Sequence, residues 1–71
     1  MSNICTRIAD VIRESGLSKT AFSRRVGLSQ PFVSQLANGA AVPSDRTILD
    51  ICREFNVSER WLRTGEGEMF V

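Results

Sequence analysis

Residues 17–39, LSKTAFSRRVGLSQPFVSQLANG, decide the fold of this chain, because they predict two short helices joined by a tight turn. One local pattern occurs twice in this stretch: an apolar residue, a serine, and a second apolar residue five positions after the first, as in Leu17-Ser18 with Phe22. The serine caps a helix by accepting hydrogen bonds from first-turn amides, and the two apolar residues pack together beside it. We therefore predict helices over residues 19–26 and 30–37, with Gly27 in a left-handed conformation between them.

The same signals continue through the rest of the chain and predict an all-α fold. The start pattern returns at Val57-Ser58 with Leu62, and Ser44 opens another helix in a looser version of it. Apolar residues at helical spacing predict a further helix at the beginning of the chain, and no alternating strand pattern competes. The five predicted helices form a compact domain over residues 1–65, followed by a C-terminal tail over 66–71, and span residues 3–15, 19–26, 30–37, 45–55 and 59–63.

Helices of this length are marginal in isolation, so we expect each to bury one apolar face in a common core. The tail ends in three apolar residues, Met69-Phe70-Val71, that have no place in this core. The sequence leaves three roles open for them: folding back, pairing with a second chain, or continuing into another domain. The residues assigned to the core are Ile8, Val11, Leu17, Phe22, Val26, Leu28, Val33, Leu36, Ile48, Ile51, Cys52, Phe55, Trp61 and Leu62.

Composition excludes several classes of function. The 71 residues, 42% of them hydrophobic and 24% charged, are enough for one modest globular core without a deep catalytic cavity. There is no histidine and no grouping of nucleophile and base, so we predict that the chain is not an enzyme and holds no metal or cofactor. No small-molecule ligand is evident, and no apolar run is long enough to span a membrane. Cys5 and Cys52 are expected to be small core residues in a reducing cytoplasm.

The net charge of +1 conceals a segregated pattern. Residues 17–43 contain Lys19, Arg24 and Arg25 and no acidic residue, whereas residues 44–71 carry more acidic than basic side chains. The acid-free stretch coincides with the predicted helix pair, which is the distribution that a nucleic-acid partner requires. Three positive charges attract such a partner only weakly, so we expect one protomer alone to bind nucleic acid weakly.

The chain resembles a known family over nearly its whole length. The resemblance is to the lambda-repressor-like, Cro-type helix-turn-helix regulators of phages and bacteria. It implies a cytoplasmic, five-helix repressor domain whose third helix enters the major groove of double-stranded operator DNA, usually as a homodimer on a pseudo-palindromic site. The motifs that carry it are Leu17-Ser18-Lys19, Gly27-Leu28-Ser29-Gln30, Val33-Ser34-Gln35-Leu36-Ala37-Asn38-Gly39, Pro43, and Val57-Ser58-x-x-Trp61-Leu62-x-Thr64-Gly65.

The resemblance also assigns candidate DNA contacts. Glutamine can pair with the N6 and N7 atoms of adenine, whereas serine discriminates less between bases. Without the surrounding motif these residues would be interpreted as solvated helix surface. Phosphate contacts are expected at helix starts and loops, where free amides meet an anion. The expected base contacts are Gln30, Pro31, Ser34 and Gln35, and the expected phosphate contacts are Ser18, Lys19, Ser29, Asn38, Gly39 and Ala40.

Some positions depart from the family pattern. Relatives often carry, at the position of Lys19, a glutamine that braces the base-contacting glutamine, so we expect lysine to keep the phosphate contact and to weaken the brace. The loop Ala40-Ala41-Val42 lacks the usual basic residues, which leaves a second function open: a protein-interaction module such as an antirepressor or an antitoxin-like partner.

Two further side chains are interpreted in two ways each. For Phe32, packing against the fourth helix is weighed against contact with a thymine methyl group. For Trp61, a place in the core is weighed against an interface. The apolar pair Ile12 and Ala37 replaces an ion pair that is common in the family, and we expect a packing contact instead.

Overall fold

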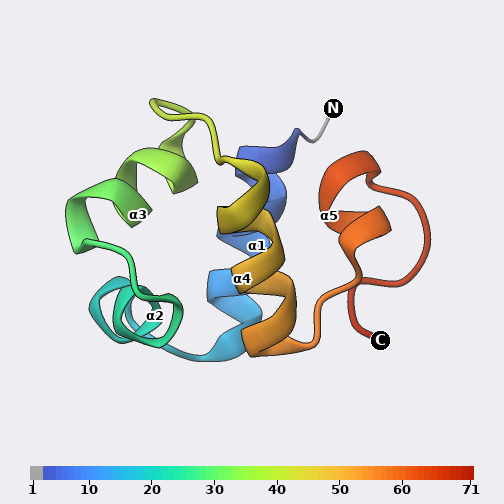
Figure 1. The fold of residues 1–71 in the computed structure, drawn as a ribbon, viewed down its shortest axis with the longest axis horizontal. Helices are drawn as coiled ribbons and strands as arrows, with labels where there is room; N and C mark the ends of the chain where they lie inside the picture. Colours follow the sequence, from blue (N-terminus) through green and yellow to red (C-terminus); the bar gives the residue numbers. More distant parts are fainter. Residues whose placement is uncertain (1–2) are drawn as a thin grey trace.

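The computed structural model describes residues 3–71, and this part of the chain forms five helices. The helices α2 and α3 lie on one side of α1 and α4, and α5 lies on the other side (Figure 1). The prediction of an all-α fold is confirmed, and the predicted helix ends agree with the observed ones to within one residue. The helices are α1 (Ile4–Ser15), α2 (Lys19–Val26), α3 (Gln30–Asn38), α4 (Asp45–Phe55) and α5 (Glu59–Thr64).

Each helix begins at a polar side chain that caps it. In α1 the side chain of Asn3 accepts a hydrogen bond from the Thr6 amide at 3.0 Å, so the helix starts one residue later than predicted. The predicted serine caps of the other four helices are all present. The helices end at residues in the left-handed conformation, which at the end of α4 is Asn56 with φ 54°.

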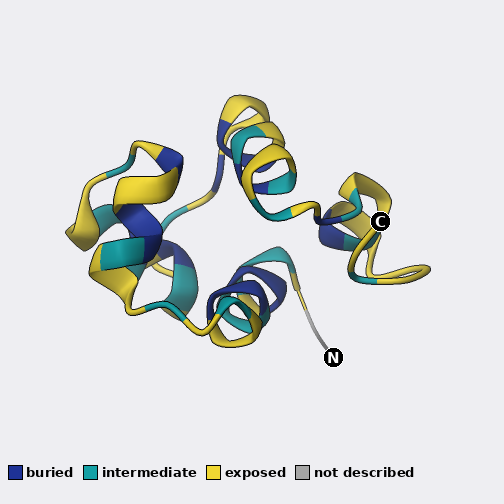
Figure 2. Ribbon diagram, turned by 90° about the horizontal axis from the view of Figure 1, so that it is seen from below, coloured by how far each residue is buried: buried dark blue, intermediate teal, exposed yellow. Residues whose placement is uncertain are grey.

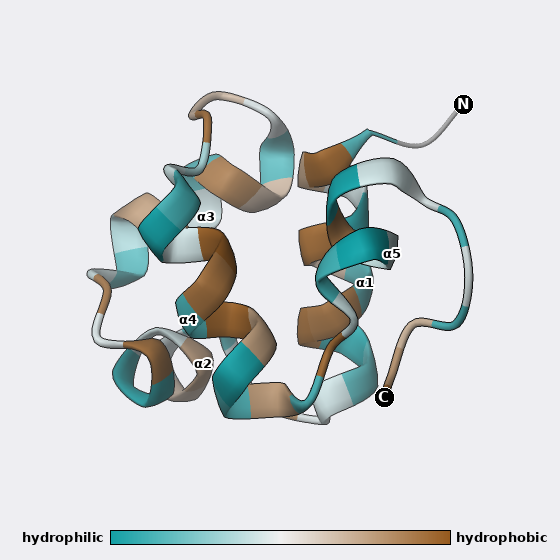
Figure 3. Ribbon diagram, turned by 45° about the vertical axis from the view of Figure 1, so that its right-hand side comes forward, coloured by the Kyte–Doolittle hydropathy of each residue, from teal (hydrophilic) through white to brown (hydrophobic). Residues whose placement is uncertain are grey.

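The hydrophobic core lies between α1 and the helices around it. The helix α1 packs against α3 and α5, while α2 packs against α3 and α4, and α4 packs against α5. Hydrophobic segments of α1 and α4 face the middle of the molecule (Figure 3), and the exposed residues lie on the outer faces of the helices (Figure 2). The buried apolar residues are Ile8, Val11, Ile12, Phe22, Val26, Val33, Leu36, Ile48, Ile51, Val57 and Leu62.

The predicted core was wrong at its edges. Two buried residues, Ile12 and Val57, were not assigned to it. Conversely, five predicted core residues are only partly buried against it, because they lie in turns or on the flanks of helices where one side meets solvent. These five residues are Leu17, Leu28, Cys52, Phe55 and Trp61. The prediction for Cys5 was also wrong, because this residue is half-buried and does not belong to the buried core.

The end of the chain folds back on the segment between α4 and α5. The Ser58 amide donates to the Met69 carbonyl at 2.8 Å, and the Val71 amide donates to the Asn56 carbonyl at 2.9 Å. These bonds form a short antiparallel bridge between Val57 and Phe70. Of the three roles left open for the apolar tail, folding back is the one observed in this structure.

A buried arginine joins the first helix to the last. The side chain of Arg7 on α1 is only 6% exposed. Its Nε donates to the Leu62 carbonyl at 2.8 Å, and its Nη2 donates to the Arg63 carbonyl at 3.0 Å. Both carbonyls belong to the last turn of α5, where a positive charge also interacts favourably with the helix dipole.

Candidate nucleic-acid interface

The exposed face of α3 brings the four predicted base-contacting residues together. Gln30, Pro31 and Gln35 are exposed and Ser34 is half-buried, while Val33 and Leu36 on the opposite face of the helix are buried. The helix lies at the edge of the molecule, next to α2 (Figure 1). Its polar face is therefore open along its length to a large partner.

Within this face one side chain is held by another. The Nε2 atom of Gln30 donates a hydrogen bond to the Oγ atom of Ser34, one helical turn further on, at 3.2 Å. No hydrogen bond between Lys19 and Gln30 is present among residues 3–71. The expected loss of a brace from position 19 is thus accompanied by a contact within α3.

The beginning of α2 presents free amide donors beside a cation. The hydroxyl of Ser18 caps the helix by accepting from the Ala21 amide at 3.1 Å. The amides of Lys19 and Thr20 belong to the first turn, where no earlier carbonyl of the helix can accept from them. Because both residues are exposed, these amides and the Lys19 ammonium group can meet one anion together.

The beginning of α3 offers fewer donors. Pro31 has no amide hydrogen, which suits the first turn of a helix. The Phe32 amide donates to the Ser29 hydroxyl at 3.3 Å. The backbone amides that remain free to bind an anion at this end of α3 are those of Gln30 and of the cap residue Ser29.

The turn after α3 uses its own amides. The Ala40 amide donates to the Gln35 carbonyl at 2.8 Å and to the Asn38 side-chain oxygen at 3.0 Å. The Gly39 amide also donates to carbonyls of the last turn of α3. At the predicted contact Asn38-Gly39-Ala40, the group left to approach a phosphate is therefore the side-chain amide nitrogen of Asn38. Beyond this turn, Val42 is 86% exposed.

One of the three cations of the acid-free stretch, Arg25, is exposed but lies against α4. The Nε of Arg25 lies 3.7 Å from a carboxylate oxygen of Glu54 on α4, and its guanidinium lies 5.1 Å from the centroid of the Phe55 ring. The Phe55 ring in turn stacks on Phe22, with centroids 4.7 Å apart. Arg25 therefore serves the packing of α2 on α4, a role that sequence reasoning missed.

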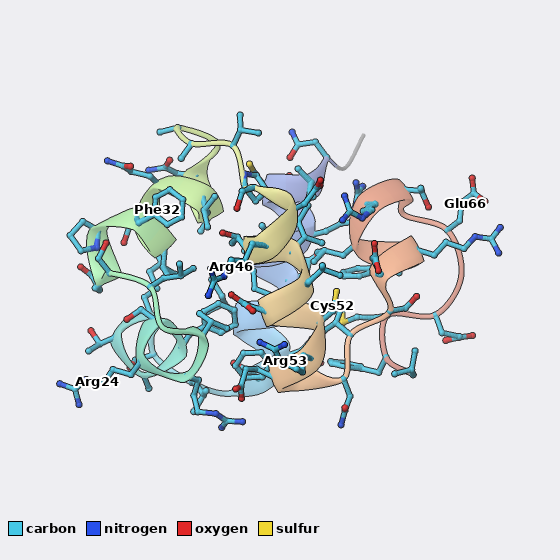
Figure 4. All side chains as sticks on the ribbon, in the orientation of Figure 1. Arg24, Phe32, Arg46, Cys52, Arg53 and Glu66 are labelled. Carbon is cyan, nitrogen blue, oxygen red and sulfur yellow. The ribbon has the colours of Figure 1, made fainter. Side chains whose placement is uncertain are left out.

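The other two cations remain available. Among residues 3–71 no ion pair involves Lys19 or Arg24. The side chain of Arg24 extends away from the body of the molecule at the outer edge of α2 (Figure 4). Two of the three cations of this stretch, Lys19 and Arg24, are therefore without an ion-pair partner among residues 3–71, whereas Arg25 lies beside Glu54.

The side chains with two interpretations take their places in or beside the core. Phe32 and Trp61 are both half-buried and pack against it. Ile12 is buried and Ala37 is half-buried against the same core, so both contribute apolar contacts. Packing is thus the observed role of these residues.

The remaining chemistry of the described residues is limited. Over residues 3–71 no group of histidine, cysteine or acidic side chains is arranged to hold a metal ion, and no enclosed pocket is found. None of the helices in this range has the length and hydropathy needed to cross a membrane. Both cysteines are free, and burial raises the pKa of the Cys52 thiol above its ordinary value.

Comparison with known proteins agrees with this geometry. The sequence profile of the helix-turn-helix family matches residues 8–62, which include all of α2, α3 and α4 and part of α1 and α5. The chain belongs to the lambda-repressor-like helix-turn-helix family. Among solved structures, this helix-turn-helix domain is similar to the P22 c2 repressor protein, which was crystallised in complex with a synthetic operator. The TM-score is 0.84 at 20% identity, over 93% of this chain and 100% of that one.

Curated relatives of this helix-turn-helix chain are longer proteins. It is 29% identical over 69 residues to the HTH-type transcriptional regulator for conjugative element R391 of Providencia rettgeri. It is equally similar to the corresponding regulator for conjugative element SXT of Vibrio cholerae. The match covers 97% of this chain and 32% of each relative, so the chain spans about a third of their length.

Proposed function

We propose that this chain is a sequence-specific double-stranded DNA-binding regulator of transcription, acting as a repressor that occupies an operator. The observation that carries the proposal is the exposed polar face of α3, held beside the beginning of α2 in a helix-turn-helix domain. In this arrangement α3 enters the major groove and the beginning of α2 meets the phosphate backbone. The family is one of DNA-binding regulators and not of enzymes.

In the proposed complex Gln30 and Gln35 contact bases, each able to pair with the N6 and N7 atoms of adenine. The Lys19 ammonium and the first-turn amides of α2 form the main phosphate contact, because three or more donors converge there. Ser29 and the Asn38 side chain add weaker phosphate contacts at the two ends of α3. This division assigns affinity to α2 and sequence preference to α3.

We further propose that the chain binds DNA as a homodimer. Two free cations in the helix-turn-helix give one protomer little affinity of its own, and a second copy doubles the number of phosphate contacts. Exposed apolar side chains on α4 and on the folded-back tail supply candidates for contact between copies, namely Leu49, Phe70 and Val71. A two-fold dimer would match a pseudo-palindromic operator.

A second function is favoured by one observation, the apolar loop after α3. Val42 is 86% exposed at a place where a DNA-binding relative would carry basic residues. A protein partner that covers this loop would make the chain an antirepressor or an antitoxin-like module with weak DNA binding.

Selection of duplexes from a random pool tests the main proposal, because it detects binding and finds the operator together. On the selected duplex, Lys19→Ala should weaken binding at every sequence and reduce the salt slope by about one unit. Gln35→Ala should cost about 1–3 kcal/mol and relax preference at one base pair. The matched control is Arg53→Ala, which removes an α4 cation that is paired with Asp50 at 2.7 Å. Recovery of no duplex at low salt by the folded protein would rule out the proposed function in favour of a protein partner.

A further inference from the structure

We infer that Ser34 is a positioning residue, which orients the side chain of Gln30 for base contact and does not contact a base itself. The inference rests on the proposed function for its consequence in DNA binding. Its structural part concerns the free protein alone: the hydrogen bond of 3.2 Å from Gln30 Nε2 to Ser34 Oγ fixes the direction of the glutamine amide.

The donors and acceptors of Gln30 are sufficient for both contacts at once. A glutamine side chain has two N–H donors on Nε2 and an acceptor at Oε1. Pairing with adenine uses one N–H, which donates to N7, and the oxygen, which accepts from the N6 amino group. The second N–H remains available for the bond to Ser34. The bond to Ser34 therefore leaves the adenine-pairing edge of Gln30 complete and restricts its rotation.

The position of Ser34 favours this role over direct contact with a base. Ser34 is half-buried, whereas Gln30 and Gln35 on the same face of α3 are exposed. Its hydroxyl oxygen already accepts from Gln30. No hydrogen bond from Lys19 reaches Gln30 among residues 3–71, so the hydrogen-bond partner found for the Gln30 amide lies within α3 itself.

The orienting contact can be measured in the free protein. In ¹⁵N relaxation of the side-chain amides, the Gln30 Nε2 group should be more ordered than that of Gln35, for which no side-chain bond is found among residues 3–71. Ser34→Ala should reduce the order of Gln30 to the level of Gln35, and Ser34→Thr, which keeps a hydroxyl, should retain it. Alanine is the best helix former, so the fold of α3 is preserved. Unchanged order of Gln30 in Ser34→Ala would overturn the inference.

The consequence for DNA is tested on the duplex that the wild-type protein selects. Ser34→Ala should lower affinity about 2- to 10-fold, the usual cost of immobilising one flexible side chain on binding. The loss of affinity should fall on the same base pair as that of Gln30→Ala, and Ser34→Ala should cause no additional loss in a protein that already carries Gln30→Ala. In the control double variant, Ser34→Ala combined with Gln35→Ala, the two losses of binding free energy should add. Loss of preference at a base pair of its own would show that Ser34 contacts a base and would refute the inference. If the wild-type protein selects no duplex, the proposed function fails, while the amide measurement still decides whether Ser34 orients Gln30.

Discussion

Replacement of Arg7 by alanine is expected to destabilise the domain strongly, although Arg7 is remote in sequence from the α5 residues that it contacts. The variant removes the donors to the Leu62 and Arg63 carbonyls, at 2.8 and 3.0 Å, from a side chain that is 6% exposed. A hydrogen bond with a charged partner contributes about 1.5–3 kcal/mol to stability. Part of this loss is offset in the variant, because it no longer buries a charge. We expect a loss of about 3 kcal/mol, which for a domain of this size lowers Tm by about 12–24 °C.

The assay is urea unfolding followed by circular dichroism, with Arg13→Ala as the matched control. Arg13 lies on the same helix, its side chain is 70% exposed, and it pairs with Asp10 at 2.7 Å. A surface pair of this kind contributes at most about 1 kcal/mol. Arg7→Lys should fall between the two variants, because one ammonium group keeps the charge and lacks the planar fork of donors. Equal stabilities of Arg7→Ala and Arg13→Ala, within about 0.5 kcal/mol, would refute the reasoning.

Three further outcomes are expected. Gly65→Ala should destabilise the domain more than Gly67→Ala. Both glycines have positive φ (82° and 84°), but a Cβ at Gly65 would lie 3.2 Å from Arg7 Nη1, whereas a Cβ at Gly67 would have no atom within 4 Å. Coinciding urea midpoints of the two variants would contradict this prediction. Burial raises the pKa of Cys52 in the folded state, so the contribution of this thiol to stability should be present below the unfolded-state pKa and be lost as the pH rises through the folded-state pKa. The difference in unfolding free energy between the wild-type protein and Cys52→Ala should therefore shrink from about pH 8 to 10, and a constant difference would count against this prediction. Leu49→Lys should shift the concentration-dependent mass towards the monomer without loss of helix content, and an unchanged mass would exclude α4 from the dimer contact.

The helix starts were predictable because their signals are local. A serine cap and the apolar pair beside it lie within five residues of one another, and the cap bond forms to an amide three residues away, as from Ala21 to Ser18. The turn glycine Gly27 has φ 75°, as its position between two helices requires. The members of the α3 face followed from helical periodicity and from the family resemblance together.

The contacts that sequence reasoning missed join distant parts of the chain. Arg7 and Leu62 are 55 positions apart, and Arg25 and Glu54 are 29 apart. No local pattern marks either pair, because their proximity depends on how α1 packs on α5 and α2 on α4. For the same reason the bridge between Val57 and the tail was one of several open alternatives. The identities of the buried residues at helix flanks, such as Ile12, depend on the same packing.

The link between the first and the last helix has a consequence for the order in which the domain is completed during synthesis. Arg7 leaves the ribosome before α5, and the carbonyls that it binds follow 55 and 56 residues later. Contacts of such large separation form after local helix pairs, and a domain closes only when its last element has emerged. The pair α2 and α3 is therefore synthesised in full before the domain can close. A nascent chain that stops before α5 exposes the face of α1 on which α5 packs.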